Sequence, residues 1–269
     1  MKSSRTLWIL SVLITIVSAA YQRITGPTYP VRVRQVFAGG EVRSKLPRSY
    51  PGAGDCPVRV EAGETVTGSL AWKRFKTADS WTAVEMKRVG GALEAMLPHQ
   101  PAAGKLQYEI TLRKGPAETR LPGVVIRFRG DVPAAVLIVH ILAMFGGMLL
   151  STRAGLGAWA GEQRLKALML WTLGFLAAGG MVLGPLVQKY AFDAYWTGWP
   201  FGTDLTDNKT AAAVVIWLIA YWAMPRVRSP RAWAAGAAVA TLAVFMIPHS
   251  VLGSELDYSK QDGAAASSK

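Results

Sequence analysis

The chain has 269 residues, 51% of them hydrophobic, and 30 Lys and Arg against 17 Asp and Glu give a formal net charge of +13. This combination fits a membrane protein with a polar domain better than a single soluble core. Cys56 is the only cysteine, which excludes a disulfide within the chain and any zinc or iron–sulfur site built from several cysteines.

Five apolar segments cover residues 7–21, 133–151, 167–187, 210–224 and 232–249. Basic residues precede the first segment and separate the second from the third and the fourth from the fifth (Lys2, Arg5; Arg153, Arg164, Lys166; Arg226, Arg228, Arg231). Short membrane-flanking loops rich in Lys and Arg stay in the cytoplasm. The pattern therefore predicts a bundle of about five transmembrane helices in a bacterial inner membrane, with the N-terminus inside and the C-terminus outside.

Residues 1–22 have the features of an N-terminal anchor and of a signal peptide. A charged start precedes an apolar stretch, and Val17-Ser18-Ala19 resembles a small-residue cleavage site. Tyr21 continues the apolar stretch and suits an interfacial anchor. We favour an uncleaved anchor, with cleavage as the alternative.

Residues 23–131 show a different pattern, in which apolar and polar residues alternate in short runs. The runs cover residues 31–34, 58–61, 65–72, 83–87, 106–112 and 124–128, and clusters of Gly, Pro, Asp and Ser separate them. With one or two weaker candidates, about seven strands over ~100 residues predict an antiparallel β-sandwich inserted between the first two membrane segments, on the periplasmic side.

Leu106 and Tyr108 form a Leu-x-Tyr motif in one of these predicted strands. The motif resembles the tyrosine corner of immunoglobulin-like and fibronectin-type domains. The resemblance implies a phenol hydrogen-bonded to nearby backbone, and it implies a fold only, since fold does not determine function.

Positive charge is concentrated in the predicted sandwich. Residues 22–130 contain 18 Lys and Arg against 9 Asp and Glu, a net charge of +9. Such a surface favours membrane lipids with anionic head groups or an acidic protein partner. Nucleic acid is not an expected partner, because the domain faces away from the cytoplasm.

Residues 132–252 are predicted to form a four-helix transmembrane bundle, followed by a disordered outer tail at residues 253–269. Gly180 and Gly184 form a small-xxx-small pair, which allows close helix packing either within the chain or against another subunit.

The outer loop at residues 188–209 is the most distinctive part of the sequence, with six aromatic residues and three carboxylates. Thr206 or Asp207 is expected to cap the following helix. Alternatively, the loop is a lid or docking surface for a quinone, a lipid or a partner subunit, in which acidic side chains bind a cation or accept protons. Its candidate contact residues are Trp196, Trp199, Phe201, Asp204, Asp207, Asn208 and Lys209.

His140 and His249 lie in or at the end of predicted spans, and Met144 stands one turn after His140. Ionisable residues within membrane spans are functional candidates by default, and imidazole and thioether groups are ligands of haem iron and of copper. The alternative is that the histidines are neutral and hydrogen-bonded to backbone, with Met144 packed in the core.

Standard catalytic signatures, such as a phosphate-binding loop, His-Glu-x-x-His or Gly-x-Ser-x-Gly, are absent from the sequence. The sequence therefore favours a non-catalytic accessory or assembly subunit of a respiratory or photosynthetic membrane complex, with other membrane-protein subunits as partners. The alternative is a membrane redox protein that binds haem b or quinone through His140, His249 and the aromatic outer loop.

Overall fold

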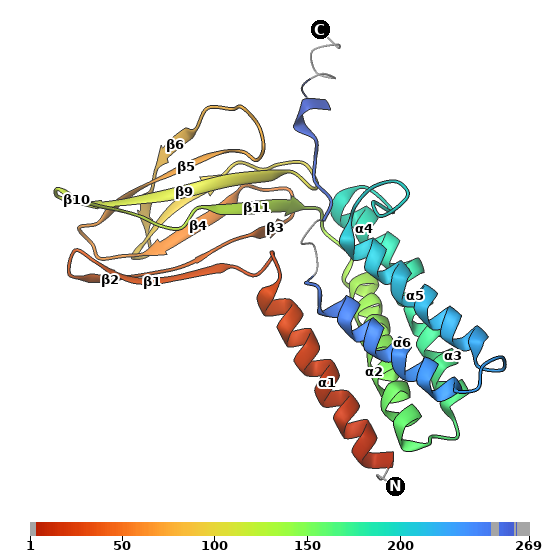
Figure 1. The fold of residues 1–269 in the computed structure, drawn as a ribbon. Helices are drawn as coiled ribbons and strands as arrows, with labels where there is room; N and C mark the ends of the chain where they lie inside the picture. Colours follow the sequence, from red (N-terminus) through yellow and green to blue (C-terminus); the bar gives the residue numbers. More distant parts are fainter. Residues whose placement is uncertain (1–3, 249–252, 261, 263–269) are drawn as a thin grey trace. The chain divides into compact units, whose positions relative to one another are not determined.

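The computed structural model describes residues 4–248, 253–260 and 262 (Figure 1). The chain divides into two compact units. One comprises Met1–Pro27 and Val132–Ser254 and is helical, and the other comprises Thr28–Asp131 and Glu255–Lys269 and holds the strands. His249, one of the candidate ligands, lies outside the described residues.

The helical unit contains α1 (Ser4–Thr25), α2 (Ala134–Ala160), α3 (Leu165–Leu176), the π-helix η1 (Ala177–Leu183), α4 (Gly184–Phe192), α5 (Leu205–Ala223) and α6 (Pro230–Met246). Three helical stretches are long and apolar enough to cross a membrane: Ser4–Thr25, Ala134–Ala160 and Leu165–Phe192. The prediction of membrane helices is confirmed to this extent. The other two expected spans are weaker, because α5 begins with a polar turn and α6 has 17 residues.

Helix α1 has its polar side chains inside and its large apolar side chains outside. Between residues 7 and 18, Ser11, Thr15 and Ser18 are buried, whereas the exposed residues are all apolar, such as Leu13 and Val17. The hydroxyls of Ser11 and Thr15 each donate to a carbonyl one turn earlier, at 2.8 Å. Small residues at the helix contacts and large apolar residues on the outer surface are typical of a helix surrounded by lipid.

The third predicted span is one continuous helix with a π-helical section in its middle. Pro185 follows this section, and a proline lacks the N–H that would bond four residues back and clashes with that carbonyl. A wider turn relieves this conflict locally. The glycines of the section allow close packing: a Cβ on Gly179 would stand 2.9 Å from Ala143 Cβ in α2, and one on Gly180 would overlap Thr210 in α5. These small residues therefore serve packing within the chain.

The described residues of the other unit form eleven strands: β1 (Val31–Phe37), β2 (Gly40–Leu46), β3 (Ser49–Pro51), β4 (Cys56–Glu61), β5 (Thr67–Arg74), β6 (Thr82–Glu85), β7 (Lys87–Val89), β8 (Ala92–Leu97), β9 (Lys105–Lys114), β10 (Ala117–Arg120) and β11 (Val124–Arg129). One sheet has the order β1-β2-β4-β8-β7, and the other has β3-β11-β9-β5-β6 with β10 beside β9. All pairs are antiparallel except β3 with β11. The prediction of β-sheets is confirmed, and several of the additional strands are short.

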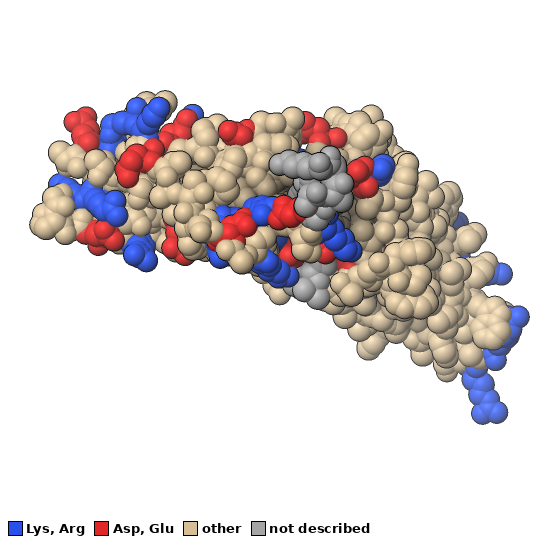
Figure 2. Space-filling model, turned by 90° about the horizontal axis from the view of Figure 1, so that it is seen from above, with Lys and Arg blue, Asp and Glu red and all other residues tan. Residues whose placement is uncertain are grey.

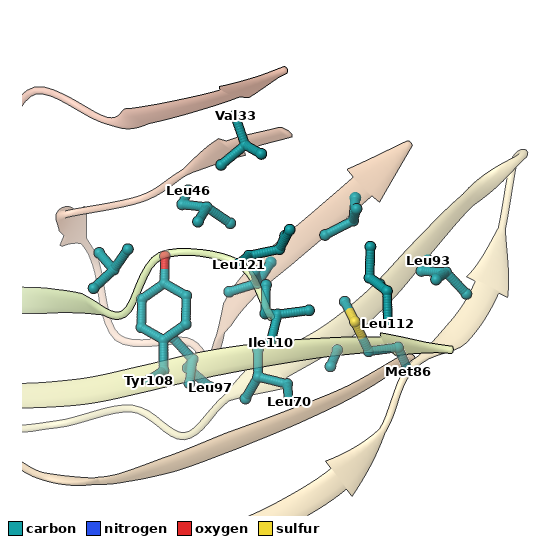
Figure 3. Close-up of a cluster of buried hydrophobic side chains, with 14 of the residues drawn as sticks. Val33, Leu46, Leu70, Met86, Leu93, Leu97, Tyr108, Ile110, Leu112 and Leu121 are labelled. Carbon is teal, nitrogen blue, oxygen red and sulfur yellow. The ribbon is translucent and has the colours of Figure 1, made fainter. Parts of the chain in front are cut away.

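One hydrophobic core lies between the two sheets and draws on both (Figure 3). Leu46 and Leu97 from one sheet and Leu106 and Ile110 from the other are essentially inaccessible to solvent. Cys56 belongs to this core, and burial raises the pKa of its thiol to about 12. Cys56 is therefore a packed side chain that stays protonated at neutral pH.

Tyr108 differs in one respect from the expected tyrosine corner. Its side chain is buried in the core, and its hydroxyl donates to the carbonyl of Pro47 at 3.0 Å, 61 residues away in the sequence. The acceptor is not nearby in the chain, because the ring points across the core towards the end of β2 (Figure 3). The phenol thus links β9 to the segment that connects β2 with β3.

The beginning of the C-terminal segment differs from the disorder expected at residues 253–269. Tyr258 is buried against the strand unit, and its hydroxyl has two acceptors for its one proton, Gln100 Oε1 at 3.0 Å and the Lys105 carbonyl at 3.1 Å. Leu256 N donates to the Ala103 carbonyl, and Asp262 pairs with Arg74 at 2.8 Å. Burial of the Tyr258 ring and the two acceptors of its hydroxyl order the beginning of this segment. The polar composition of the tail gave no indication of this packing.

Candidate functional site

The segment 188–209, the aromatic loop of the sequence analysis, comprises the end of α4, the connection at residues 193–204 and the first turn of α5. Asp204 is the N-cap of α5, and its carboxylate accepts a hydrogen bond from Thr206 N at 2.7 Å. The expected cap, Thr206 or Asp207, is therefore wrong, because the helix begins at Leu205 rather than a residue or two later. Ser254 adds two donors to the same carboxylate, its N at 2.9 Å and its Oγ at 3.1 Å.

Asp207 and Asn208 bind the middle of the loop from the first turn of α5. The Asp207 carboxylate accepts from Thr197 N at 2.7 Å and from Gly198 N at 3.0 Å. Asn208 Oδ1 accepts from Trp199 N at 2.7 Å. Three consecutive backbone N–H groups thus have side-chain acceptors, which satisfies donors that a buried loop would otherwise leave unpaired.

Gly198 allows this close approach. A Cβ at this position would stand 2.7 Å from both Asn208 Oδ1 and Asp207 Cβ, so any larger residue would push the loop away from α5. Asp204 and Asp207, two of the three carboxylates that make this segment acidic in the sequence, therefore hold the loop in its conformation.

Lys209 is buried although it is a lysine, with 4% of its surface exposed. Its ammonium donates to the Ile247 carbonyl at 2.7 Å, at the C-terminal end of α6, and lies 6.0 Å from the centroid of the Phe245 ring. A cation is favourable at a helix C-terminus, where free carbonyls carry partial negative charge. Lys209 therefore ties α5 to α6.

The aromatic side chains of the loop divide into two groups. Trp199 is 77% exposed and Phe201 83% exposed, and Tyr195 and Tyr190 are also exposed. Trp196 is partly buried, and its indole N–H donates to the Trp199 carbonyl at 3.1 Å. The projecting set is thus Trp199 and Phe201 together with Tyr190 and Tyr195, which the sequence interpretation did not single out. The sequence signal that could have identified Tyr190 and Tyr195 is that both are aromatic residues in a loop expected at the membrane interface.

His140 lies in α2 opposite the π-helical section. Its Nδ1 is 2.9 Å from the Gly179 carbonyl, and Met144 packs beside Gly179 and Gly180. Because a carbonyl oxygen only accepts, Nδ1 is the donor in this contact, and in a neutral imidazole Nε2 then carries no proton. Among the described residues, no group of three or more His, Cys, Asp or Glu could hold a metal ion.

Comparisons with known proteins give no family. No protein-family model and no curated protein matches the chain. A solved structure described as "Crystal structure of Br derivative BhCBM56" aligns with 35% of this chain and 97% of that one, at 9% identity and a TM-score of 0.27. A likeness this weak carries no argument about fold or function. The class of protein is defined by its own features: apolar helices long enough to cross a membrane, joined to a two-sheet unit.

Proposed function

We propose that this protein is a non-catalytic accessory or assembly subunit of a membrane complex, and that its aromatic loop docks on another membrane-protein subunit. The observation that carries this proposal is the exposure of Trp199 and Phe201 on a loop whose backbone is fixed by Asp204 and Asp207. Aromatic side chains in such positions dominate the energetics of many interfaces.

The fixed conformation of the loop matters for affinity. A flexible loop loses conformational entropy when it binds, whereas a loop that is already ordered avoids most of that cost. Burying one large apolar side chain contributes about 1.5–3 kcal/mol. Two such rings on an ordered frame would be the anchors of a larger contact, and the carboxylates of the loop are engaged in holding backbone amides.

The proposed setting is a bacterial inner membrane crossed by five helices, with the N-terminus inside and an immunoglobulin- or fibronectin-like sandwich in the periplasm. The alternation of Lys- and Arg-rich segments supports this orientation. The surface seen in Figure 2 agrees with a division of this kind, since most charged atoms gather over the strand unit and the helical unit shows mainly uncharged atoms.

The test is purification of the wild type and the double variant Trp199→Ala/Phe201→Ala from the native host in mild detergent, followed by quantitative mass spectrometry. We expect a stoichiometric membrane-protein partner with the wild type and its loss with the double variant. The control is Trp159→Ala, which removes a ring that is 85% exposed at the far end of α2. A monomeric wild type, or a partner retained by the double variant, would contradict the proposal.

A second candidate function is a redox protein that binds haem b or quinone, and the hydrogen bond between His140 and the Gly179 carbonyl favours it. A metal-binding histidine commonly donates its other ring N–H to a carbonyl in this way. This function predicts a Soret band in the purified protein that disappears in His140→Ala and persists in His99→Ala. A colourless preparation from cells supplied with haem would exclude the haem version.

A further inference from the structure

The outer face of the sheet β1-β2-β4-β8-β7 contains a groove of about 930 Å³. Five cationic side chains line it, with Glu61 as the single carboxylate among the lining residues (Arg32, Arg34, Arg43, Lys45 and Arg59). The turn between β7 and β8 contributes Gly90 and Gly91. The groove belongs wholly to the strand unit and is separate from the aromatic loop.

The register of the strands arranges these cations in rows. Arg32 in β1 stands opposite Lys45 in β2, and Arg34 stands opposite Arg43. The pairing of β2 with β4, in which Ser44 faces Val60, extends the first row from Lys45 to Arg59. Because neighbouring strands are about 4.8 Å apart, this row carries three cations across about 10 Å.

The carboxylates of this face compensate only part of the charge. Glu41 bridges Arg34 and Arg43 at 2.6 and 2.5 Å, and these two guanidinium groups hold its pKa at about 2. Glu94 pairs with Arg59. Among the described residues no carboxylate pairs with Arg32 or Lys45, although like charges directly opposite each other destabilise a sheet. Arg32 lies over the Tyr29 ring, 5.5 Å from its centroid, and both Arg32 and Lys45 are exposed, so this pair of cations is accessible to an anionic ligand.

Three classes of polyanion could bind these cations: an anionic lipid bilayer, an acidic sugar polymer and an acidic polypeptide. The shape and composition of the groove suit them to different degrees. An anionic bilayer is flat and uniformly negative, whereas this surface is concave and has Glu41, Glu61 and Glu94 between its cations. An acidic sugar polymer carries its charges on stiff rings, and the described residues that line the groove include no aromatic side chain to stack on a sugar face. An extended acidic polypeptide carries separated carboxylates on flexible side chains, and guanidinium groups bind carboxylates in a bidentate manner.

We propose that this groove binds an extended, Asp- and Glu-rich segment of a protein partner, with carboxylates placed on Arg32 and Lys45. Side chains at alternate positions of an extended chain are about 7 Å apart, which long Arg and Lys side chains can match across adjacent strands. The groove is a second interaction surface, and it does not depend on docking through the aromatic loop.

The test measures binding of a fluorescein-labelled peptide of eight glutamates to the full-length protein in zwitterionic detergent, by fluorescence anisotropy. We expect Arg32→Gln/Lys45→Gln to weaken binding by about tenfold or more, because both charged contacts are lost. We also expect its melting temperature to equal or exceed that of the wild type, since the substitutions remove a like-charge pair. A merely structural role of the two cations would instead lower the melting temperature.

The matched control is Lys114→Gln/Arg120→Gln, which removes the same charge from β9 and β10 on the other sheet. It should bind the peptide within about twofold of the wild type. Equal weakening in both double variants would show non-specific attraction and overturn the proposal. Dihexanoyl phosphatidylglycerol, as a competitor, distinguishes lipid from peptide: if it displaces the peptide at micromolar concentration, the head group is the occupant and the proposal is wrong.

Discussion

Asp207 illustrates how a residue that looks functional in the sequence acts in the structure. It is 7% exposed and accepts hydrogen bonds from two consecutive backbone amides of the aromatic loop. A buried carboxylate in this position is stable because its acceptor capacity is used by N–H donors. At the residue scale, the acidic character of the loop therefore determines its shape.

Replacing Asp207 with Ala should expose this role. The substitution leaves two buried N–H groups without acceptors, and each unsatisfied group costs about 1–3 kcal/mol. We expect faster hydrogen exchange at the amides of Thr197 and Gly198, measured by mass spectrometry in detergent, and partial rescue by Asp207→Asn. The control Asp193→Asn neutralises a carboxylate that is 81% exposed in the same loop, keeps a residue type that tolerates the left-handed conformation of this position, and should leave the exchange rates unchanged. Unchanged rates in Asp207→Ala would contradict the role.

At the scale of elements, the C-terminal segment completes the strand unit. Glu255 pairs with Lys105 at 2.7 Å, and Tyr258 packs beneath the Arg74 guanidinium, 4.9 Å from its ring centroid. The chain thus returns to its strand unit after leaving the helical unit at Ser254. We regard residues 255–260 and 262 as part of the β fold.

Substitution of Tyr258 should lower the free energy of unfolding of the strand unit, and the loss should be larger when the whole ring is removed than when only the hydroxyl is removed. Tyr258→Phe loses the hydroxyl donor and should cost about 1 kcal/mol, whereas Tyr258→Ala also loses the ring and should cost about 3 kcal/mol. The exposed Ser259→Ala serves as the control. Chemical denaturation followed by far-ultraviolet circular dichroism measures the differences, and equal stabilities of the three variants would exclude the proposed role.

The same contact predicts a dependence on pH. Burial raises the pKa of Tyr258 to about 12 from its ordinary value of 10.0, so the folded state favours the neutral phenol. The contribution of Tyr258 is complete below about pH 10 and is lost as the pH rises through the interval up to about 12. Tyr258→Phe should therefore reduce the loss of stability between these pH values.

At the scale of the whole molecule, orientation is the feature that decides which surfaces can meet a partner. The buried thiol of Cys56, with its raised pKa, is a poor target for labelling, so new cysteines can be introduced into the otherwise unchanged chain. Ser229, between α5 and α6, and Tyr195, in the aromatic loop, are both exposed.

We expect a membrane-impermeant maleimide to label Tyr195→Cys in intact spheroplasts, and Ser229→Cys only after the membrane is permeabilised. This result follows from the basic residues that flank Ser229, which favour the cytoplasmic side. The reverse pattern of labelling would show the opposite orientation. It would also place the aromatic loop in the cytoplasm, where the proposed periplasmic contact is impossible.

Part of this protein is determined by its sequence alone. Long apolar segments and period-two alternation are local patterns, so they predicted the helices near residues 7–21, 133–151 and 167–187 and the main strands, such as the one around Tyr108. The same reasoning singled out the loop at residues 188–209 from its composition. The partners of its carboxylates were not predictable, because Ser254 lies 50 residues from Asp204 in the chain.

Only the tertiary structure decided how these local elements meet. The row formed by Arg32, Lys45 and Arg59 exists because β1, β2 and β4 pair in one register, and a shift by one residue would turn the side chains to the other face. The acceptor of Tyr108 and the docking of Tyr258 likewise depend on contacts between distant segments. The periodicity of apolar residues is a property of neighbouring residues, so it can be recognised in the sequence. Strand register and side-chain packing depend on contacts across the whole chain. Both the aromatic loop and the cationic groove depend on register and packing.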